Sequence, residues 1–392
     1  MIDLDLTPAD EEVLAVARRQ ADIYRAHAKR LDREIDYSKG DFAEQLKIPG
    51  EDEFVHVRNL AQERAAETSA FEIIDALIYM EEMSGFKPSY HKGHGDDSLD
   101  LSLARKLLKI IGTEEQIELY SKDHFAWGMS EPQTGADPAA LRTKAVYDAA
   151  TDEWVVNGEK VFTSTATQAD GVMVLCRCHG PEGDEGIGIV LLRKGTPGYA
   201  VSPQMKKLGL RNWDTVGVSF SDCRVPNVAR LRGNLKDALS IFNGTRAIIA
   251  GQALGYARTA MNVLRDELQR MGTAVDYGAD LAQRTAIEDR LVRLEALYDA
   301  TYLTMLHAKW HEGARGRDKF YPSLAKMKAG LAVRKIITEV MNILGPMSTT
   351  ERLPVEQALR DSRILDIYEG PNEVQKLLLG RVLLGYGAKD LN

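Results

Sequence analysis

Cysteine is scarce in this chain, and its scarcity excludes one class of fold. Only Cys176, Cys178 and Cys223 occur among 392 residues. A small, odd number of cysteines in a long chain does not build a disulfide scaffold, and it favours a reducing compartment. The sequence therefore predicts a fold held together by its core, without disulfide bonds.

An excess of positive charge and a long apolar run are also lacking. Fifty basic side chains against 58 acidic ones leave a formal charge of −8, whereas nucleic-acid binding needs a concentrated basic face. The longest apolar runs, such as residues 187–192, fall far short of the ~20 residues that span a bilayer. The first residues are acidic and do not resemble a secretory signal. We expect a soluble cytoplasmic protein that binds no nucleic acid and has no membrane span.

The spacing of apolar residues changes twice along the chain. Apolar residues recur every three or four positions up to about residue 124, short β-type runs follow to about 235, and the helical period then returns. The predicted fold class is α+β. Its expected parts are an N-terminal all-helical domain (1–124), a central small antiparallel β-barrel or sandwich (125–235), and a C-terminal four-helix bundle (236–392).

Three local patterns give sharper expectations. Asn157-Gly158 stands between two apolar runs and predicts a hairpin turn. In the C-terminal part, one apolar stripe runs from Ile287 to Met305, and a second contains Leu324, Met327, Leu331, Ile337, Val340 and Leu344. Each stripe predicts the buried face of a bundle helix.

Two segments could carry chemistry. Residues 128–137 combine a hydroxyl, an acid and glycines in a loop after a strand, which suits a polar ligand edge but is equally typical of an ordinary turn. Near the C-terminus, Glu369 precedes Gly370-Pro371 and follows Ile367 and Tyr368. A carboxylate held among apolar neighbours can act as a base, although a solvated loop glutamate fits the same residues.

Together these segments resemble the acyl-CoA dehydrogenase family of flavoproteins. The resemblance covers the chain from about residue 103 to 385, and the order of helices, β module and helices is similar to the family's. Six motifs agree in order and spacing: residues 112–116, 128–137, 156–164, 206–215, 222–226 and 360–370.

The resemblance implies FAD-dependent α,β-dehydrogenation of an acyl-CoA thioester to the trans-2-enoyl-CoA, in fatty-acid or side-chain β-oxidation. Glu369 would remove the α-proton while flavin N5 takes the β-hydride, and the Glu369 backbone N–H with a flavin ribityl hydroxyl would polarise the thioester carbonyl. In some members the base lies on the bundle helix, where this chain has Thr245, which cannot serve.

Further site residues are implied by the same matching. The implied substrate side comprises Asn243, Arg246 and Gly370. The implied cofactor side comprises Trp127, Met129, Ser130, Ala136, Phe162, Thr163, Ser164, Pro371 and Glu373. The Ser130 hydroxyl would meet the pyrimidine edge of the flavin, Phe162 would cover the ring, and Ser164 would bond near N5.

Departures from the family pattern bear on the oligomer. Ala136 replaces a serine, and Phe162 replaces a tryptophan. Ala274 and Thr285 stand where the family lends an arginine and a glutamine to a neighbouring subunit, and residues 342–348 keep only Gly345 of a glycine-rich run. These departures favour a heterotetramer with a related subunit that supplies the missing groups, with a homotetramer as the alternative.

The expected electron acceptor is an electron-transferring flavoprotein, as in most of this family. The alternatives are an acyl-CoA oxidase or a flavin monooxygenase on the same fold, or a partner subunit without its own turnover. His307 and His311 have metal-ligand spacing but no evident third ligand, and Cys176, Cys178 and His179 do not form a usual zinc arrangement. We therefore expect no metal. The absence of a glycine-rich Rossmann fingerprint argues against NAD.

Overall fold

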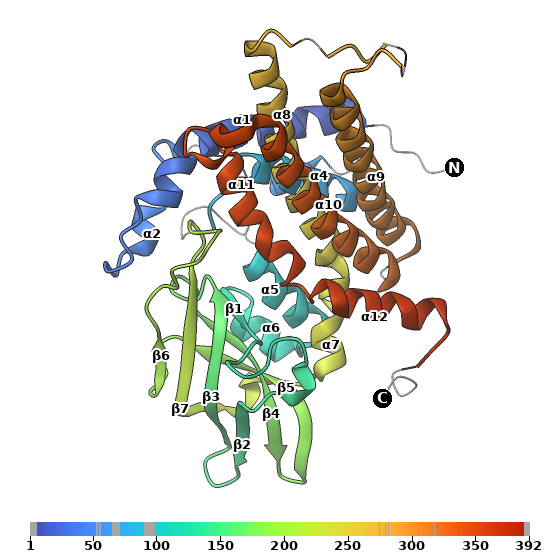
Figure 1. Cartoon of the computed structure of the whole chain (residues 1–392). Coiled ribbons are helices and arrows are strands. Elements are labelled where there is room, and N and C mark those ends of the chain that lie inside the picture. Colours follow the sequence, from blue (N-terminus) through green and yellow to red (C-terminus); the bar gives the residue numbers. More distant parts are fainter. Residues whose placement is uncertain are drawn as a thin grey trace.

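The fold was analysed in a computed structural model of the chain. The structure describes residues 6–51, 54, 56–64, 71–89, 99–273, 275–278, 280, 282–316 and 318–387. Helices come first, a sheet follows, and helices end the chain (Figure 1). The fold class predicted from the sequence is confirmed, with one difference in the sheet.

The first part of the chain is helical. Its helices are α1 (Pro8–Arg33), α2 (Phe42–Gln45), α3 (Val57–Glu63), α4 (Phe71–Ser84), α5 (Leu99–Ile111) and α6 (Glu114–Tyr120). Thr7 begins α1 with a capping box in which its hydroxyl accepts from the Asp10 backbone N–H and the Asp10 carboxylate accepts from the Thr7 N–H. Reciprocal bonds of this kind satisfy N–H groups that a helix start leaves without partners.

One mixed sheet forms the middle of the chain. Its strands are β1 (Phe125–Gly128), β2 (Lys144–Asp148), β3 (Glu153–Ser164), β4 (Gly171–Gly180), β5 (Gly183–Arg193), β6 (Tyr199–Val201), β7 (Thr215–Pro226) and β8 (Arg230–Leu231). The spatial order is β6-β7-β3-β2-β4-β5-β8, and β1 also pairs with β4. The expectation of a wholly antiparallel sheet needs correction, because β4 runs parallel to both β1 and β2.

The hairpin predicted at Asn157-Gly158 is wrong. These residues lie inside β3, at a bulge in its pairing with β7. Asn157 exchanges two hydrogen bonds with Asp222, its Nδ2 donating at 3.0 Å and its Oδ1 accepting at 2.9 Å. Gly158 has a φ of +139°, and a Cβ there would lie 2.7 Å from the Thr143 Cα. The dipeptide therefore serves a close approach between strands rather than a turn.

Long helices return after the sheet. They are α7 (Leu235–Ser240), α8 (Phe242–Arg270), α9 (Ala286–Arg315), α10 (Phe320–Leu344), α11 (Val355–Ser362) and α12 (Asn372–Leu383), with short 3-10 turns η4 (Gly345–Thr349) and η5 (Arg363–Asp366) around α11. Helices α8, α9 and α10 pack side by side, and α12 runs out from α10 (Figure 1). No helix within the described ranges is long and apolar enough to cross a membrane.

The two apolar stripes behave differently. The stripe on α9 is confirmed, since Leu291, Leu294 and Met305 are buried. The stripe on α10 is wrong in its first half, because Leu331 is 41% exposed and Leu324 is only partly buried. The buried face there consists mainly of small residues such as Ala325 and Ala329. Small side chains let α10 lie close to its neighbours, so the larger apolar residues lie on the outer side.

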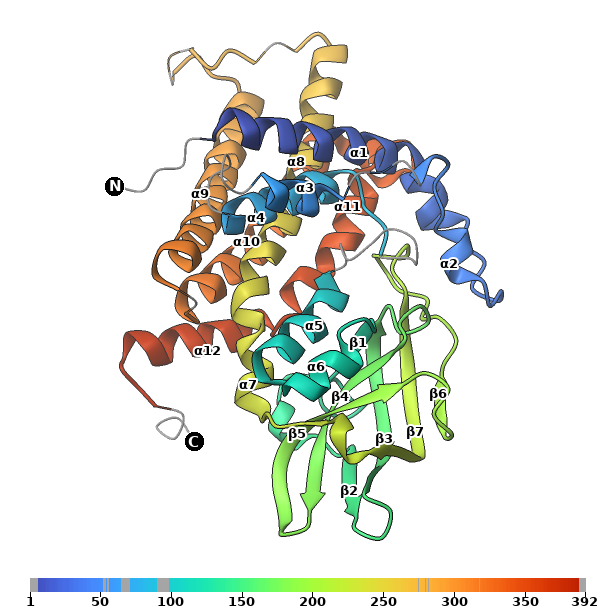
Figure 2. The same ribbon diagram turned by 180° about the vertical axis from the view of Figure 1, so that it is seen from behind.

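Two large cores hold the fold together, and both cross the boundaries suggested by the sequence. The sheet shares its core with α5, α6 and α7, which lie along it in Figure 2. Helices α1 and α4 instead share a core with α8, α9 and α10. The division at residues 124 and 235 therefore stays a prediction.

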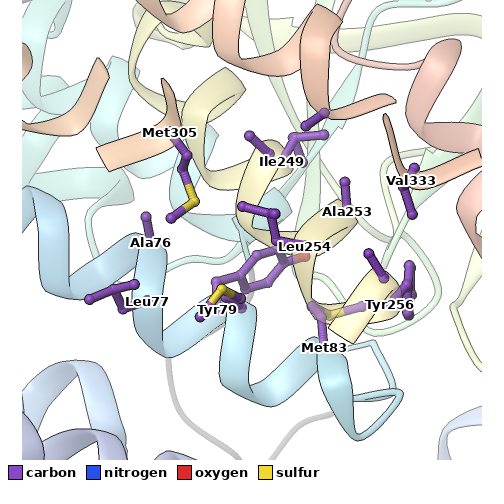
Figure 3. Close-up of a cluster of buried hydrophobic side chains, with 14 of the residues drawn as sticks. Ala76, Leu77, Tyr79, Met83, Ile249, Ala253, Leu254, Tyr256, Met305 and Val333 are labelled. Atoms are coloured by element: carbon purple, nitrogen blue, oxygen red, sulfur yellow. The ribbon is translucent and has the colours of Figure 1, made fainter. Parts of the chain in front are cut away.

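A close glycine contact joins α4 to α8. A Cβ on Gly251 would lie 2.8 Å from the Ala76 carbonyl oxygen, and one on Gly255 would lie 2.6 Å from that of Met80. Such distances require glycine, because real Cβ atoms do not approach backbone oxygens this closely. Around this seam the side chains of α4, α8, α9 and α10 interdigitate, as Figure 3 shows.

Candidate active site

Glu369 lies between η5 and α12, in a backbone conformation that non-glycine residues rarely adopt. Its φ is +57°, and Gly370 follows with a φ of +88°. An uncommon left-handed residue needs surrounding contacts to hold it, and such residues cluster at functional sites. The side chain is partly buried, and its Oε2 accepts a hydrogen bond from the Thr245 hydroxyl at 3.0 Å. One carboxylate oxygen therefore has a fixed position relative to α8.

Three side chains from three helices bind the backbone around Glu369. Arg246 Nε of α8 donates to the Glu369 carbonyl at 3.3 Å. Gln375 Nε2 of α12 donates to the carbonyls of Glu369 and Gly370 at 3.1 and 3.0 Å. Lys326 Nζ of α10 donates to the Gly370 carbonyl at 2.8 Å. These bonds hold the left-handed Glu369–Gly370 backbone in place from three helices.

Two buried cations contribute to the electrostatics around Glu369. Burial lowers the pKa of Arg246, and the Glu369 charge opposes that shift. Burial also lowers the pKa of Lys326, to about 8, while Asp366 and Glu369 raise it and Arg246 lowers it. Positive charge close to a carboxylate favours its ionised form. The Arg246 guanidinium also donates to Asn243 Oδ1 at 3.2 Å, so the implied substrate-side residues Asn243, Arg246 and Gly370 lie together beside Glu369.

The expected apolar surroundings of Glu369 are only partly present. Ile367 is 47% exposed and points its apolar surface outward. Tyr368 is partly buried, and its hydroxyl donates to the buried Gln252 of α8. The side chains around Glu369 are therefore mainly polar and come from α8, α10 and α12, since a left-handed turn directs successive side chains to different sides.

The implied flavin-side residues come together on β1, β3 and the loop between β1 and β2. The Val161 backbone N–H donates to the Ser130 carbonyl at 2.9 Å, which lays Met129 and Ser130 against β3. Phe162 follows directly, with a φ of +54° and a side chain that is 66% exposed. A large aromatic ring held out in this way offers a flat surface to a planar partner.

A buried ion pair, which the sequence analysis did not assign, fixes this loop. Lys160 Nζ lies 2.7 Å from Glu131 Oε1 and also donates to the Met129 carbonyl at 3.1 Å. The Glu131 carboxylate accepts from the backbone N–H groups of Arg142 and Thr143 at 2.7 and 2.9 Å. Burial alone would raise the pKa of Glu131, but these donors outweigh burial and lower it to about 2. The pair pins the loop to β3 beside Phe162.

Trp127 links the two halves of the candidate site. Its ring meets Phe242 edge to face, with centroids 5.6 Å apart. Phe242 is the first residue of α8, directly before Asn243 and close to Thr245 and Arg246. The surface carrying Phe162 and the carboxylate of Glu369 are thus connected through the start of α8.

The donors in this region fit a flavin ring. The Trp127 indole Nε1 and the Thr163 hydroxyl are buried and have no hydrogen-bond partner among the residues that the structure describes. Buried polar groups normally have partners. A flavin carries carbonyl and ring-nitrogen acceptors on one edge, and exposed Phe162 would meet its face. The residues present are therefore compatible with an isoalloxazine ring beside β1 and β3.

Three further implied cofactor residues lie outside β1 and β3. Ala136 is exposed in the loop before η2 (Pro138–Ala140), and Pro371 is the residue before α12. The Glu373 side chain is 79% exposed and pairs with Lys376 at 2.9 Å. Their roles toward a cofactor stay predictions.

The positions expected to serve a neighbouring subunit are engaged within this chain. The Thr285 hydroxyl accepts from the Glu288 N–H at 3.2 Å and caps α9. Gly345, with a φ of +66°, ends α10, and Ser348 donates back to its carbonyl at 2.7 Å. Ala274 lies outside the described residues. Thr285 and Gly345 therefore each have a structural role at the end of a bundle helix.

The histidines and cysteines considered as metal ligands make other contacts in the fold. His311 lies 2.9 Å from Asp318, and the His307 ring stacks on Trp310 with centroids 5.9 Å apart. Cys176 and Cys178 are buried on β4, where the Cys178 thiol donates to the Cys176 carbonyl at 3.7 Å.

Comparison with known proteins identifies the family. The model of the acyl-CoA dehydrogenase middle domain matches residues 126–223, and that of the acyl-CoA dehydrogenase C-terminal domain matches residues 235–384. The short-chain-specific acyl-CoA dehydrogenase of Clostridium acetobutylicum is 31% identical over 298 residues, which cover 72% of this chain and 76% of that protein. The chain therefore belongs to the acyl-CoA dehydrogenase family, and it is an oxidoreductase of this flavoprotein family.

Solved structures agree with this assignment. Butyryl-CoA dehydrogenase from Megasphaera elsdenii is 25% identical, with a TM-score of 0.78 over 98% of this chain and 100% of that chain. A glutaryl-CoA dehydrogenase from Mycobacterium smegmatis in complex with FADH2 is 23% identical, with a TM-score of 0.75 over 99% of this chain and 96% of that chain. At that identity the second likeness shows the fold alone.

Proposed function

We propose that this protein catalyses the FAD-dependent α,β-dehydrogenation of an acyl-CoA thioester to the trans-2-enoyl-CoA, with Glu369 as the base. The observation that carries the proposal is the fixed Glu369 carboxylate, bonded to Thr245 at the start of α8, where Phe242 meets Trp127 of the flavin-side cluster. A held carboxylate beside a surface suited to a flavin is the arrangement that this reaction needs.

Each group has a defined task in this proposal. Glu369 takes the α-proton onto its carboxylate, and the Thr245 hydroxyl orients that carboxylate. Asn243, Arg246 and Gly370 lie where the thioester would contact the chain. Bound FAD would accept the β-hydride at N5. Trp127, Met129, Ser130, Phe162, Thr163 and Ser164 would hold its ring, with Ala136, Pro371 and Glu373 as outer contacts.

A panel of acyl-CoA thioesters tests the proposal directly. We expect one class of thioester to bleach the flavin absorbance of the FAD-loaded protein under anaerobic conditions and to yield the enoyl-CoA product. The panel should include straight, branched, ring and side-chain acyl groups, because their identity is open. Free CoA is the matched control and should leave the flavin oxidised. Bleaching by no thioester, with the flavin fully bound, would contradict the proposal.

The proposed electron acceptor is an electron-transferring flavoprotein. The same anaerobically reduced protein should be reoxidised rapidly by such a flavoprotein and slowly by air. Rapid peroxide formation in air would favour the acyl-CoA oxidase alternative instead, because an oxidase delivers its electrons to oxygen.

We also propose a cytoplasmic location, which the free state of Cys176, Cys178 and Cys223 supports.

The oligomer is proposed to be a heterotetramer with a related subunit. Support comes from Ala274 and Thr285, which stand where the family lends an arginine and a glutamine to a neighbouring subunit, and from residues 342–348, which keep only Gly345 of a glycine-rich run. We expect this chain, purified alone, to bind less than one FAD per subunit, and co-expression with a related subunit to raise the ratio of active flavin. Flavin absorbance and light scattering measure both quantities. A homogeneous, active homotetramer with one FAD per subunit would contradict the heterotetramer.

A further inference from the structure

Lys326 is a buried lysine in the first half of α10. Its side chain is only 1% exposed, and small residues flank it on the same helix at Ala325 and Ala329. Among the described residues, no ion pair joins Lys326 to a carboxylate; its ammonium instead donates to the Gly370 carbonyl at 2.8 Å and to Asn372 Oδ1 at 3.1 Å. A buried ammonium is costly unless its surroundings compensate for lost hydration. The burial of the Lys326 ammonium therefore needs a functional or structural explanation.

The carbonyl that Lys326 binds belongs to the residue directly after Glu369. Both residues have positive φ values, +57° and +88°. A Cβ on Gly370 would lie 2.4 Å from Gln375 Nε2, so the turn is also closed on the α12 side. The ammonium of Lys326 thus holds the Gly370–Pro371 peptide, which directly follows the Glu369–Gly370 pair.

The second bond of Lys326 closes the same turn from its other end. Asn372, which accepts from Lys326, donates through Nδ2 to Asp366 Oδ1 at 2.9 Å. Asp366 in turn pairs with Arg334 of α10 at 2.8 Å and with Arg363 at 3.0 Å. Residues 366–372 therefore form a loop with Lys326 at its base and Glu369 within it.

We propose that Lys326 is a positioning residue for Glu369: it fixes the left-handed Glu369–Gly370 backbone through the Gly370 carbonyl, and its positive charge favours the ionised carboxylate. The inference rests on the proposed role of Glu369 as the base. Lys326 touches neither the α-proton nor the flavin in this scheme; its effect passes through the turn and through charge.

The expected pH dependence follows from the charged groups around the turn. Arg246 comes from α8, Asp366 from η5, and Lys326 from α10, while Asn372 and Gln375 of α12 are neutral. Removing the Lys326 charge leaves Glu369 with less positive charge nearby, so the pKa of Glu369 rises and the acid limb of kcat moves to higher pH.

The test compares Lys326→Met, Lys326→Arg and a matched control, Lys328→Met. Lys328 is also on α10, but it bonds to α9 through the Ala300 carbonyl and the Thr304 hydroxyl. We expect Lys326→Met to lower kcat on the order of 10²-fold through misplacement of the base, with KM little changed and the acid limb at higher pH. Lys326→Arg should keep kcat and the acid limb close to those of the wild type, because arginine retains the positive charge. Lys328→Met should match the wild type.

Thermal unfolding and FAD content of each variant separate positioning from folding. If kcat of Lys326→Met falls only in proportion to the folded, FAD-containing fraction, or if its pH limbs match the wild type, the inference is overturned. Should the larger arginine prevent folding, the acid limb of Lys326→Met still decides. An active Glu369→Gln variant would refute the proposed base itself. If Glu369→Gln is inactive while Lys326→Met behaves like the wild type, only the role of Lys326 is refuted.

Discussion

Replacing Glu369 with glutamine is expected to lower kcat by about 10²–10⁴-fold, the usual contribution of a positioned base, while acyl-CoA binding persists. Glutamine keeps the size of the side chain and an oxygen that can accept from the Thr245 hydroxyl, now 3.0 Å from Glu369 Oε2. It cannot take up the α-proton. Anaerobic flavin reduction followed in a stopped-flow instrument measures the loss, and spectral titration with the thioester measures binding.

The matched variant for this prediction is Glu369→Asp. Aspartate retains a carboxylate on an arm shorter by one methylene, so it should reduce flavin more slowly than the wild type and much faster than the glutamine variant. The left-handed conformation, with a φ of +57°, suits aspartate at least as well as glutamate. Near-normal flavin reduction by Glu369→Asp and Glu369→Gln alike would show that the base is another group.

Replacing Lys160 with methionine is expected to destabilise the fold by about 3–5 kcal/mol, because it leaves the buried Glu131 carboxylate without its cation. Glu131 still accepts from the backbone N–H groups of Arg142 and Thr143, but the loop loses the lysine bond to the Met129 carbonyl. Flavin retention should fall as well, since the pair pins this loop beside Phe162. Urea denaturation and FAD release measure the two effects.

A double-mutant cycle isolates the pair. Glu131→Gln combined with Lys160→Met removes both charges, so the double variant should be more stable than the sum of the single losses implies. Lys144→Met, at an exposed position on β2, is the control and should unfold like the wild type. Additive losses in the cycle would mean that the two side chains act independently.

The pH dependence of the same pair has a defined sign. Glu131 has a folded pKa of about 2 against an unfolded value of 4.5. Its stabilising contribution is therefore complete above pH 4.5 and is lost as the pH falls toward 2. In Glu131→Gln this part of the acid-induced loss of stability should be missing.

The sequence predicted the order of helices and strands well, but it predicted the close backbone contacts poorly. Periodicity identified the helices around the sheet, and the apolar run at residues 187–192 became most of strand β5. Asn157-Gly158 misled because glycine also serves a bulge where two backbones approach, as Gly158 does beside Thr143. Local pattern alone does not distinguish a turn from such an approach.

The candidate site was predictable to a similar degree. The matching motifs implied Glu369, Arg246 and Phe162 as site residues. The structure brings Glu369 and Arg246 together near the start of α8 and places Phe162 on β3, while their roles stay predictions. The contributions of Lys160 and Lys326 were missed because a lysine in a sequence is most often on the surface. The one available signal for Lys326 was its place in a run of small residues, since a helix face rich in alanine and glycine is packed closely and a lysine there is buried with it.

The glycine seam between α4 and α8 also governs how the chain can reach its native state. Ala76 and Met80 meet Gly251 and Gly255 only after the whole sheet and half of α8 have been synthesised. Contacts between segments so distant in sequence require the closure of a long loop and form slowly. During translation α1 and α4 can pack against each other, but the face of α4 that meets α8 and α9 has no partner until those later helices have been made.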